Sequence, residues 1–365
     1  MPIKKPVRVL QIVSSLSAGS GVLSVVLNWH RHIDSTQVQF DYLYTLEAPV
    51  QKKEEIQKLG GNYYKLPHPL HQPIKFLRAS YQFFRTHRYH TIHSHITHLN
   101  LFFFPLAKWF GTKNIVQHAH GSKWSDKKIN GLRNYVMLHV VWPLITHKMA
   151  CSQLAGKVYF GKKFTVVNNG IDVEKFSYNT ALRAQKRKEL DLEHNFVVGH
   201  VGRFSREKNH SFLINIFAEL VKKEPTARLV FVGDGTLKQA IEQQVLNKGL
   251  TGKVLFLGIR KDVAELYQVF DCFVLPSLHE GLGIVAIEAQ AAGLPCVLSN
   301  TLPSEVFVCN CKKLRLDAPE TWAQEILAFA KDFKREDMSV LVNTAGFSAA
   351  EVAKQMQDFY SGLEK

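Results

Sequence analysis

Cysteine is scarce in this sequence and shows no pairing pattern. Five cysteines among 365 residues are an odd, sparse count, which excludes a disulfide scaffold and favours a reducing compartment. Cys309 and Cys311 stand without the second ligand pair that a zinc site needs nearby, so we interpret them as free thiols.

Long hydrophobic runs are also missing. The most apolar stretches, 99–107 and 136–145, are too short to cross a bilayer, and each contains proline. The first residues lead into an apolar strand pattern without a signal-peptide core or a cleavage site. We therefore expect a cytoplasmic protein whose membrane contact is peripheral.

Acidic residues are few in one half of the chain. Residues 1–175 hold 23 basic and 8 acidic residues, whereas residues 176–365 hold 23 of each, so the first half carries the whole net charge of +15. This asymmetry indicates an anionic partner of one domain, either nucleic acid or an acidic membrane surface. Neither half shows a recognisable nucleic-acid module, which favours the membrane.

Two segments of the basic half mix cations with aromatic residues. The segment 74–89 is predicted to form a helix, with Ile74, Leu77, Tyr81 and Phe84 on one face and basic residues between them. A second group of cations lies near Trp124 and consists of Lys123, Lys127, Lys128 and Arg133. A surface that docks on anionic lipid and an ordinary helix with a solvated basic face explain each segment equally well.

Short apolar runs and helical patterns alternate along the chain. Residues 7–13 are a continuous apolar run, typical of a strand buried on both faces. A second alternating series follows a charged helical segment at 181–193. Two such series predict an α/β protein with two doubly wound, Rossmann-like parallel sheets facing each other across a cleft. We place the domains at 1–174 and 175–345, with a helix in 346–365 that crosses back to the first domain.

Two loops after predicted strands carry the chemistry. Arg203 and Lys208 flank the first loop, just before a helix, where free amides and the helix dipole also favour a diphosphate. In the second loop, Glu280 precedes a predicted helix and Glu288 lies about one and a half turns inside it. One carboxylate can reach a sugar and the other the vicinal hydroxyls of a ribose.

These motifs resemble the nucleotide-binding domain of the family-four retaining glycosyltransferases, which have the GT-B fold. The resemblance spans most of residues 165–300, and the first half of the chain is most similar to the capsular and exopolysaccharide branch. The matching strings are Asn169-Gly170-Ile171-Asp172, Gly202-Arg203 with Lys208, Val230-Phe231-Val232-Gly233-Asp234-Gly235, Phe256-Leu257-Gly258, Asp262-Val263, and Pro276-Ser277 with Glu280-Gly281 and Glu288.

The resemblance implies a role for each matched residue. Arg203 and Lys208 would hold the diphosphate and stabilise its developing charge, and Glu288 would bind the ribose. His120, in preference to His118, would lie near the reacting carbon. The remaining implied donor contacts are Glu280 with the backbone of Gly281, Leu282, Gly283 and Ile284 for the sugar, Gly258 and Ile259 for the base, and Gly19 for the diphosphate.

Histidines are concentrated in the first half of the chain and invite a metal interpretation. The spacing of His93, His95 and His98, and of His118 and His120, is compatible with metal ligands. We prefer strand ends at which histidines alternate between faces. The resemblance likewise implies an enzyme that needs no metal and no cofactor.

The resemblance implies retaining transfer of a sugar from a nucleotide-diphosphate donor, a UDP-sugar, to a lipid-linked saccharide in capsular or exopolysaccharide assembly. Attack would occur on the front face, with the leaving phosphate taking the acceptor proton. The implied partners are the donor, the lipid-linked glycan and the anionic inner face of the cell membrane, and no nucleic acid. Two alternatives stay open: another nucleotide-sugar enzyme on this fold, such as an epimerase, and a non-catalytic module that binds a nucleotide-sugar or an acidic surface.

Overall fold

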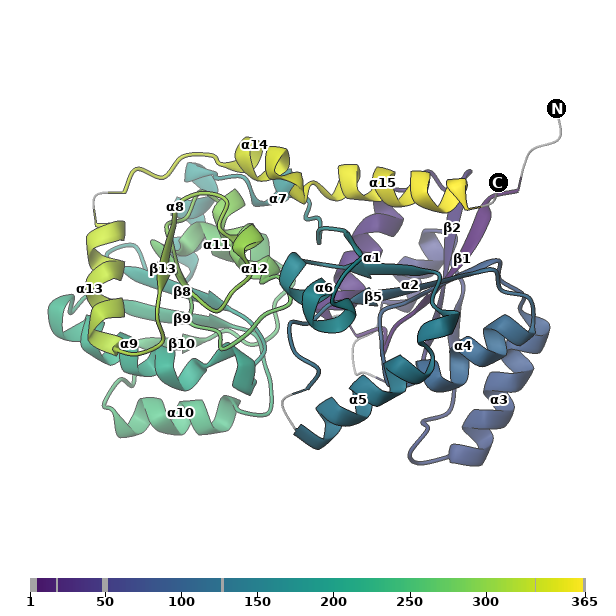
Figure 1. The fold of residues 1–365 in the computed structure, drawn as a ribbon. Coiled ribbons are helices and arrows are strands. Elements are labelled where there is room, and N and C mark those ends of the chain that lie inside the picture. Colours follow the sequence, from purple (N-terminus) through teal and green to yellow (C-terminus); the bar gives the residue numbers. More distant parts are fainter. Residues whose placement is uncertain (1–4, 18, 48–51, 126–127, 332, 364–365) are drawn as a thin grey trace. The chain divides into compact units, whose positions relative to one another are not determined.

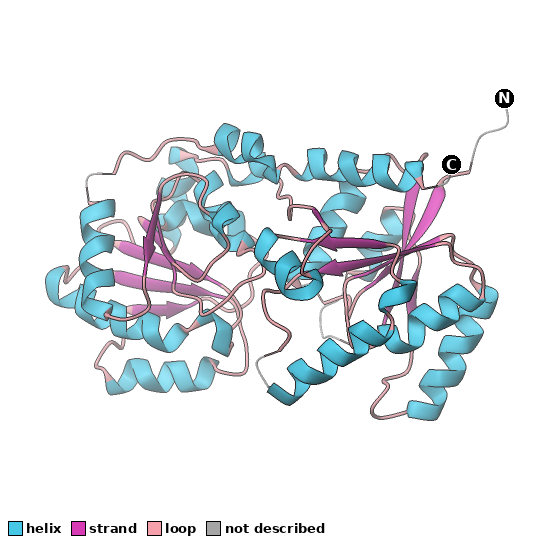
Figure 2. Ribbon diagram, viewed as in Figure 1, coloured by secondary structure: helices cyan, strands magenta, loops and turns pink. Residues whose placement is uncertain are grey.

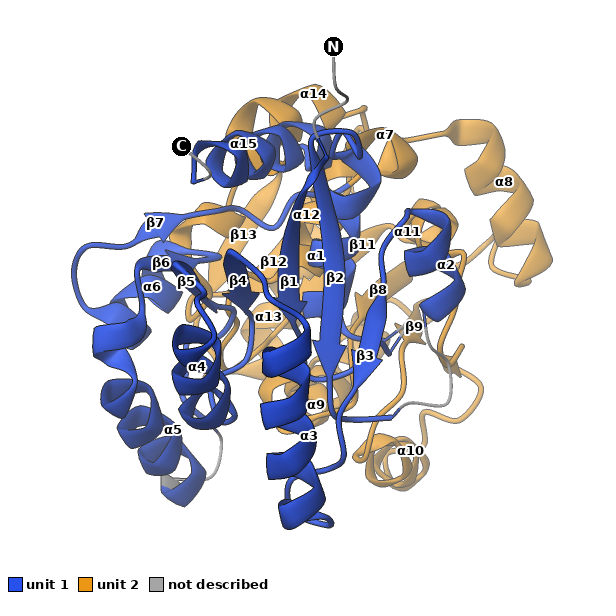
Figure 3. Cartoon of the chain, turned by 90° about the vertical axis from the view of Figure 1, so that its right-hand side faces the viewer, with its two compact units in different colours: residues 1–171, 348–365 blue, residues 172–347 orange. Residues whose placement is uncertain are grey.

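The computed structural model describes residues 5–17, 19–47, 52–125, 128–331 and 333–363. They belong to two compact units, which Figure 3 colours separately: unit 1 comprises residues 1–171 and 348–365, and unit 2 comprises residues 172–347. Each unit has one parallel sheet flanked by helices (Figure 1, Figure 2). No helix in the described part of the chain is long and apolar enough to span a bilayer.

Unit 1 contains a seven-stranded sheet in the order β3-β2-β1-β4-β5-β6-β7, with parallel pairing throughout. The strands are β1 (Val7–Ile12), β2 (Val38–Tyr44), β3 (Tyr63–Lys65), β4 (Thr91–Ser94), β5 (Asn114–Ala119), β6 (His147–Ala150) and β7 (Thr165–Val166). The helices are α1 (Gly21–His32), α2 (Lys53–Lys58), α3 (Pro73–Thr86), α4 (Asn100–Trp109), α5 (Lys128–Val140), the 3-10 turn η1 (Trp142–Leu144), α6 (Gln153–Phe160) and α15 (Ala349–Gly362).

Unit 2 repeats this winding with six parallel strands in the order β10-β9-β8-β11-β12-β13. The strands are β8 (Val197–Val201), β9 (Arg228–Val232), β10 (Val254–Phe256), β11 (Cys272–Leu275), β12 (Cys296–Ser299) and β13 (Cys311–Leu314). The helices are α7 (Val173–Phe176), α8 (Thr180–Glu189), α9 (His210–Lys223), α10 (Lys238–Asn247), α11 (Val263–Val269), α12 (Ile284–Ala291), α13 (Pro319–Ala330) and α14 (Ser339–Val342), with short turns η2 (Arg206–Lys208), η3 (Ser304–Val306) and η4 (Asn343–Phe347). The predicted pair of Rossmann-like α/β sheets is confirmed.

The last helix of the chain packs in unit 1, where α15 lies against α1, β1 and β2. The Ala349 amide donates to the Ile171 carbonyl over 2.8 Å. A Cβ atom at Gly170 would lie 2.8 Å from the Ala349 Cα, so the close approach of the two segments requires glycine there. This contact directs α15 along the sheet and brings Tyr360 into the core, where it is fully buried.

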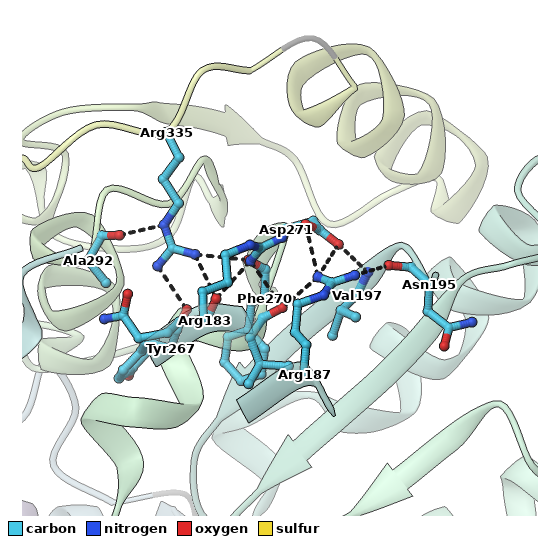
Figure 4. Close-up of polar contacts among 11 residues, drawn as sticks. Arg183, Arg187, Asn195, Val197, Tyr267, Phe270, Asp271, Ala292 and Arg335 are labelled. Atoms are coloured by element: carbon cyan, nitrogen blue, oxygen red, sulfur yellow. Dashed lines mark hydrogen bonds and ion pairs between the residues drawn. The ribbon is translucent and has the colours of Figure 1, made fainter. Parts of the chain in front are cut away.

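Three arginines cap the carboxyl end of α11, the helix that precedes the central strand β11 (Figure 4). Arg335 donates to the carbonyls of Tyr267, Gln268 and Phe270 and to that of Ala292, at the end of α12. Arg183 and Arg187, both on α8, donate to further carbonyls of this turn and form ion pairs with Asp271. Cations at a helix C-terminus satisfy its orphan carbonyls and oppose its dipole. The ends of α11 and α12 are thereby fixed by one guanidinium.

Helix α3 buries a different face from the one its pattern predicts. Phe76, Phe83 and Phe84 are buried, whereas Ile74, Leu77 and Tyr81 are exposed. Ile74, Leu77, Tyr81 and Phe84 lie on one side of the helix by their spacing, but only Phe84 is buried. The buried face is turned toward Phe76, which packs against the aromatic residues of α4, including Phe103. The outward face is therefore apolar as well as basic.

Gly293 offers a test of the close packing beside this arginine cluster. It has φ +71, and a Cβ atom there would lie 1.9 Å from the Glu336 carbonyl oxygen. We expect Gly293→Ala to lower the free energy of unfolding by about 2–4 kcal/mol, through overpacking as well as backbone strain.

The matched control is Gly249→Ala. Gly249 also follows a helix, has φ +66 and has no neighbour within 4 Å of a built Cβ, so only strain of about 1 kcal/mol is expected. Urea denaturation measures both variants, and equal losses would show that the contact with Glu336 contributes nothing.

Candidate active site

The candidate site of unit 2 lies at the switch point of its sheet, between β8 and β11, where loops of an open α/β sheet diverge and bind ligands. The loop after β8 leads to Lys208, and the loop after β11 leads to Glu280. Lys208 Nζ donates to Glu280 Oε1 over 2.7 Å, and each side chain is 13% exposed. The Leu278 amide donates to the Glu207 carbonyl over 2.8 Å and joins the two loops. The structure therefore brings together the predicted cation and carboxylate.

Glu280 is held in one orientation by two donors. Ser277 Oγ donates to Glu280 Oε1 over 2.8 Å, in addition to the bond from Lys208. A charge-assisted contact between largely buried side chains is strong and geometrically defined. The carboxylate is consequently pre-positioned through its Oε1 atom.

Two glycines of the Gly233-Asp234-Gly235 motif explain how the neighbouring loops pack. A Cβ atom at Gly233, where φ is +141, would lie 2.1 Å from the Gly202 carbonyl oxygen. A Cβ atom at Gly235 would lie 2.5 Å from the Phe204 carbonyl oxygen. Only glycine permits this approach, so the motif fixes the course of the loop that carries Arg203.

The start of α12 faces the same loops and has glycine at its N-cap. Gly283 has φ +93, and no side chain in the described part of the chain caps the helix there. The preceding Leu282 is buried, Gly281 is partly buried, and Ile284 opens the helix. An uncapped N-terminus presents amide donors and a positive dipole end, the arrangement that binds phosphate.

Glu288 lies in the second turn of α12 and contacts a tyrosine of α11. Tyr267 Oη lies 2.8 Å from Glu288 Oε2 and 2.9 Å from the Val285 carbonyl oxygen. Burial raises the pKa of Glu288 from 4.5 to about 7, against the opposing effects of Tyr267 and Lys208. The Glu288 carboxyl group therefore gains or loses its proton near neutral pH.

The other predicted donor contacts of unit 2 are more open. Arg203 is 72% exposed and pairs with Glu207 over 2.9 Å, so it is not held against Lys208 or Glu280. Gly258 has φ +67 after β10, and its carbonyl accepts from the Gly233 amide over 2.8 Å. Ile259 follows it and is exposed. Gly258 and Ile259 therefore lie on a backbone turn beside the glycine motif.

Gly19 and His120 belong to unit 1. Gly19 is exposed in the loop before α1, where its amide donates to Ser17 Oγ over 3.3 Å. His120 follows β5 and is partly exposed, whereas His118 is 1% exposed. Burial lowers the pKa of His120 to about 3, so its imidazole is neutral at physiological pH.

The interpretation that the strand-end histidines alternate between faces is wrong. His93 and His95 share one face of the sheet, and the rings of His118 and His120 stack beside them. Residues two apart along a strand point the same way, and the two strands are neighbours in the sheet. The four rings consequently form one cluster, in which His93, His95 and His118 are buried and His120 is partly exposed.

Two side chains that the sequence analysis did not single out complete the site of unit 2. Tyr267 fixes Glu288, and Ser277 fixes Glu280. Ser277 belongs to the Pro276-Ser277 string that resembles the family motif, so the sequence does contain a signal for this residue. Tyr267 lies on α11 and its contact with α12 depends on tertiary packing, so no local pattern marks it.

Comparison with known proteins identifies the family to which this chain belongs. The family model for glycosyl transferases group 1 matches residues 183–339. EpsF of Bacillus subtilis (strain 168), a glycosyltransferase by its name, is 32% identical over 97% of this chain and 96% of its own length. The chain belongs to the group 1 glycosyltransferases.

A second relative and one solved structure add to this assignment. An Escherichia coli UDP-Gal:alpha-D-GlcNAc-diphosphoundecaprenol alpha-1,3-galactosyltransferase is 28% identical over 65% of this glycosyltransferase and 64% of its own length. The Anabaena protein HepE, crystallised with UDP-glucose, is 21% identical, has a TM-score of 0.80, and the match covers 97% of this chain and 99% of HepE. That likeness shows the fold and confirms the predicted GT-B class.

The raised pKa of Glu288 predicts a pH-dependent stability. Folding favours the protonated carboxyl, so this stabilisation is complete below about pH 4.5 and is lost as the pH rises toward about 7. At pH 8 we expect Glu288→Gln to be more stable than the wild type by about 1–2 kcal/mol in the free energy of unfolding, and therefore to unfold at a higher temperature. This difference should shrink at pH 5.

Tyr267→Phe provides the linked comparison. Loss of the phenol removes a contact that lowers the Glu288 pKa, so the decline in stability should still begin near pH 4.5 but continue to a higher pH than in the wild type. Thermal unfolding across pH 5–8 measures both variants. An identical difference between wild type and Glu288→Gln at every pH would contradict the assignment of the proton to Glu288.

Proposed function

We propose that this chain is a retaining glycosyltransferase that transfers a sugar from a UDP-sugar to a lipid-linked saccharide in capsular or exopolysaccharide assembly. The transfer takes place at the cytoplasmic face of the cell membrane and uses no metal ion. The observation that carries the proposal is the Lys208–Glu280 pair beside the glycine-capped start of α12, at the switch point of the sheet.

The site suits a nucleotide-diphosphate leaving group. Lys208, with Arg203 nearby on the same loop, and the N-terminal amides of α12 supply positive potential where negative charge develops on the departing phosphate. Glu288 accepts the ribose hydroxyls, and Gly258 and Ile259 contribute backbone to the base. Arg203 turns from Glu207 to the diphosphate when the donor binds.

The fixed geometry of Glu280 favours front-face attack over double displacement. A nucleophilic carboxylate must approach the anomeric carbon, as in the carboxylate pair of a retaining glycosidase. Glu280 is instead held by Lys208 and Ser277, which suits a group that binds sugar hydroxyls. The leaving phosphate then takes the proton of the acceptor hydroxyl, the new glycosidic bond forms as the bond to phosphate breaks, and the nucleoside diphosphate leaves.

His120 acts as a neutral hydrogen-bonding group near the reacting carbon. Its low pKa removes it from service as an imidazolium acid at neutral pH. A neutral imidazole accepts at one ring nitrogen and donates at the other. We assign Gly19, in the loop before α1, to the diphosphate of the donor.

The acceptor side is unit 1, through a surface formed by α3 and α5. Ile74 on α3 is 66% exposed and Ile129 on α5 is 83% exposed, and both helices contact α4. Further exposed apolar residues on this surface are Leu77, Tyr81, Leu132, Tyr135, Val136 and Val140. The exposed cations among them include Lys75, Arg78, Arg85 and Arg133, while Lys127 of the predicted basic group lies outside the described residues.

We assign this α3–α5 surface to an anionic bilayer. Apolar side chains enter the acyl boundary while basic residues remain among the anionic headgroups. The acceptor of the E. coli relative, a diphosphoundecaprenol-linked sugar, supports a lipid-linked acceptor for this chain as well. A membrane-bound acceptor also accounts for the charge of +15 in the half of the chain that does not hold the UDP-sugar motifs.

Substitutions in the ion pair test the transfer activity. We expect Lys208→Ala and Glu280→Ala each to reduce sugar transfer from a UDP-sugar by ~100-fold or more, because each removes a fixed group that stabilises or orients the donor. Product formation from a panel of UDP- and GDP-sugars, with detergent-solubilised lipid-linked saccharide, measures the rates.

The control is Lys222→Ala, which breaks an exposed ion pair with Glu219 on α9 of the same unit and should leave turnover unchanged. Cooperative thermal unfolding confirms that the variants are folded. Near-normal transfer by both active-site variants would refute the assignment of the site.

Vesicle flotation tests the membrane surface. We expect the protein to float with vesicles that contain anionic phosphatidylglycerol, to bind less as salt rises, and to bind at least ~10-fold less after Ile74→Ser combined with Leu77→Ser. Leu246→Ser on α10, an exposed leucine of unit 2, is the matched control. Binding that is indifferent to lipid charge and to the α3 substitutions would contradict the assignment.

A further inference from the structure

Four histidines form a layered cluster in the core of unit 1. The rings of His93 and His118 are nearly parallel, with centroids 5.2 Å apart, and those of His118 and His120 are 4.2 Å apart. His93 and His95 stack at 4.4 Å. The indole of Trp29, from α1, lies against this layer at 5.8–5.9 Å.

The geometry of the cluster favours hydrogen bonding over metal binding. Nitrogen atoms of His93, His95 and His118 all lie within 4.8 Å of one another, but an imidazole lone pair lies in the plane of its ring. The facing nitrogens of His93 and His118 meet directly in a hydrogen bond of 3.1 Å, which occupies both atoms. Both ring nitrogens of His93 and of His95 already have a partner.

One arm of the network fixes the tautomer of His120. Gln11 Oε1 lies 2.9 Å from His95 Nε2, and an amide oxygen only accepts, so neutral His95 carries its proton on Nε2. His95 Nδ1 then accepts from His120 Nε2 over 2.8 Å. Burial lowers the pKa values of His95 and His120, which keeps both rings neutral. His120 Nδ1 is left with a free lone pair.

A second arm starts from the same amide and ends at His118. Gln11 Nε2 donates to Tyr360 Oη over 3.2 Å, and Tyr360 donates its proton to His93 Nδ1 over 2.6 Å. His93 Nε2 therefore carries a proton and donates to His118 Nδ1 over 3.1 Å. The remaining proton of His118 sits on Nε2, which has no partner among the described residues.

The two arms are coupled because one amide begins both. Rotating the Gln11 amide by half a turn would present a donor to His95 and an acceptor to Tyr360. Each hydrogen bond in both arms would then reverse, and His120 Nδ1 would become a donor. The structure has the first orientation, with Gln11 Oε1 toward His95 and Gln11 Nε2 toward Tyr360.

We propose that Gln11 and Tyr360 are positioning residues that hold His120 in the tautomer protonated on Nε2, so that its Nδ1 accepts a hydrogen bond from a sugar hydroxyl during transfer. His120 Nδ1 is buried and has no partner in the described part of the chain, as expected of an acceptor reserved for a ligand. This inference rests on the proposed transferase function, in which His120 contacts the reacting sugar.

The tautomer itself can be measured without substrate. Two-bond ¹H–¹⁵N correlation spectra of the full protein labelled with ¹⁵N-histidine distinguish protonated from unprotonated ring nitrogens, and single histidine substitutions assign the signals. We expect His120 to be protonated on Nε2 in the wild type. In Gln11→Leu and in Tyr360→Phe we expect a mixture of both tautomers, together with a kcat that is ~10-fold lower and a donor KM changed less than ~3-fold.

Gln11→Glu separates the two arms. Its carboxylate accepts from both sides, so His120 should keep its tautomer and kcat should recover, while the Tyr360–His93–His118 arm reverses and His118 Nε2 loses its proton. Tyr42→Phe is the matched control, because Tyr42 Oη makes a similar buried contact with His30 Nδ1 over 3.1 Å outside the network. It should change neither the His120 signals nor kcat.

Distinct results overturn each part. An unchanged His120 tautomer in folded Gln11→Leu or Tyr360→Phe refutes the positioning role, as does one equivalent of zinc in the purified protein that is lost in His118→Ala. Full turnover in His120→Ala refutes instead the contact of His120 with the sugar, whichever tautomer the ring adopts. If Lys208→Ala does not impair transfer, that result contradicts the proposed function alone.

Discussion

Unit 2 depends on the guanidinium of Arg335. This one side chain binds carbonyls at the ends of α11 and α12, and those helices carry Tyr267 and Glu288, which meet 2.8 Å apart. The planar fork of arginine presents five donors in fixed directions and here binds four carbonyls, more than the three donors of a lysine ammonium could serve singly. Because these acceptors come from separate parts of the chain, the orientation of the Glu288 carboxylate is supported by a residue that lies outside every sequence motif of the site.

The titratable groups of the candidate site carry little net charge. Lys208 and Glu280 neutralise each other in the structure, and each side chain is 13% exposed. The pKa of Glu288 is raised to about 7, and burial lowers the pKa values of His93 and His118 in unit 1, which keeps these two rings neutral. Fixed dipoles and few net charges are the features that make electrostatic stabilisation effective in a partly dry site.

The sequence predicts the parts of the protein that local patterns determine. The helix at 263–269, the central strands and the two carboxylates follow from apolar runs, glycines and spacing. Strands β3 and β13 escape prediction because they are short and one carries Lys312 and Lys313 at the sheet edge. The inward face of α3 and the histidine cluster depend on partners far away in the chain, so neither spacing nor composition reveals them.

The position of α15 bears on the order in which the protein is made. Gln11 and Tyr360 are separated by 349 positions yet share a hydrogen bond, and the whole of unit 2 is synthesised between them. The histidine cluster therefore lacks its hydrogen bond to Tyr360 until the whole of unit 2 has been synthesised. The core of unit 1 can thus be completed only at the end of translation.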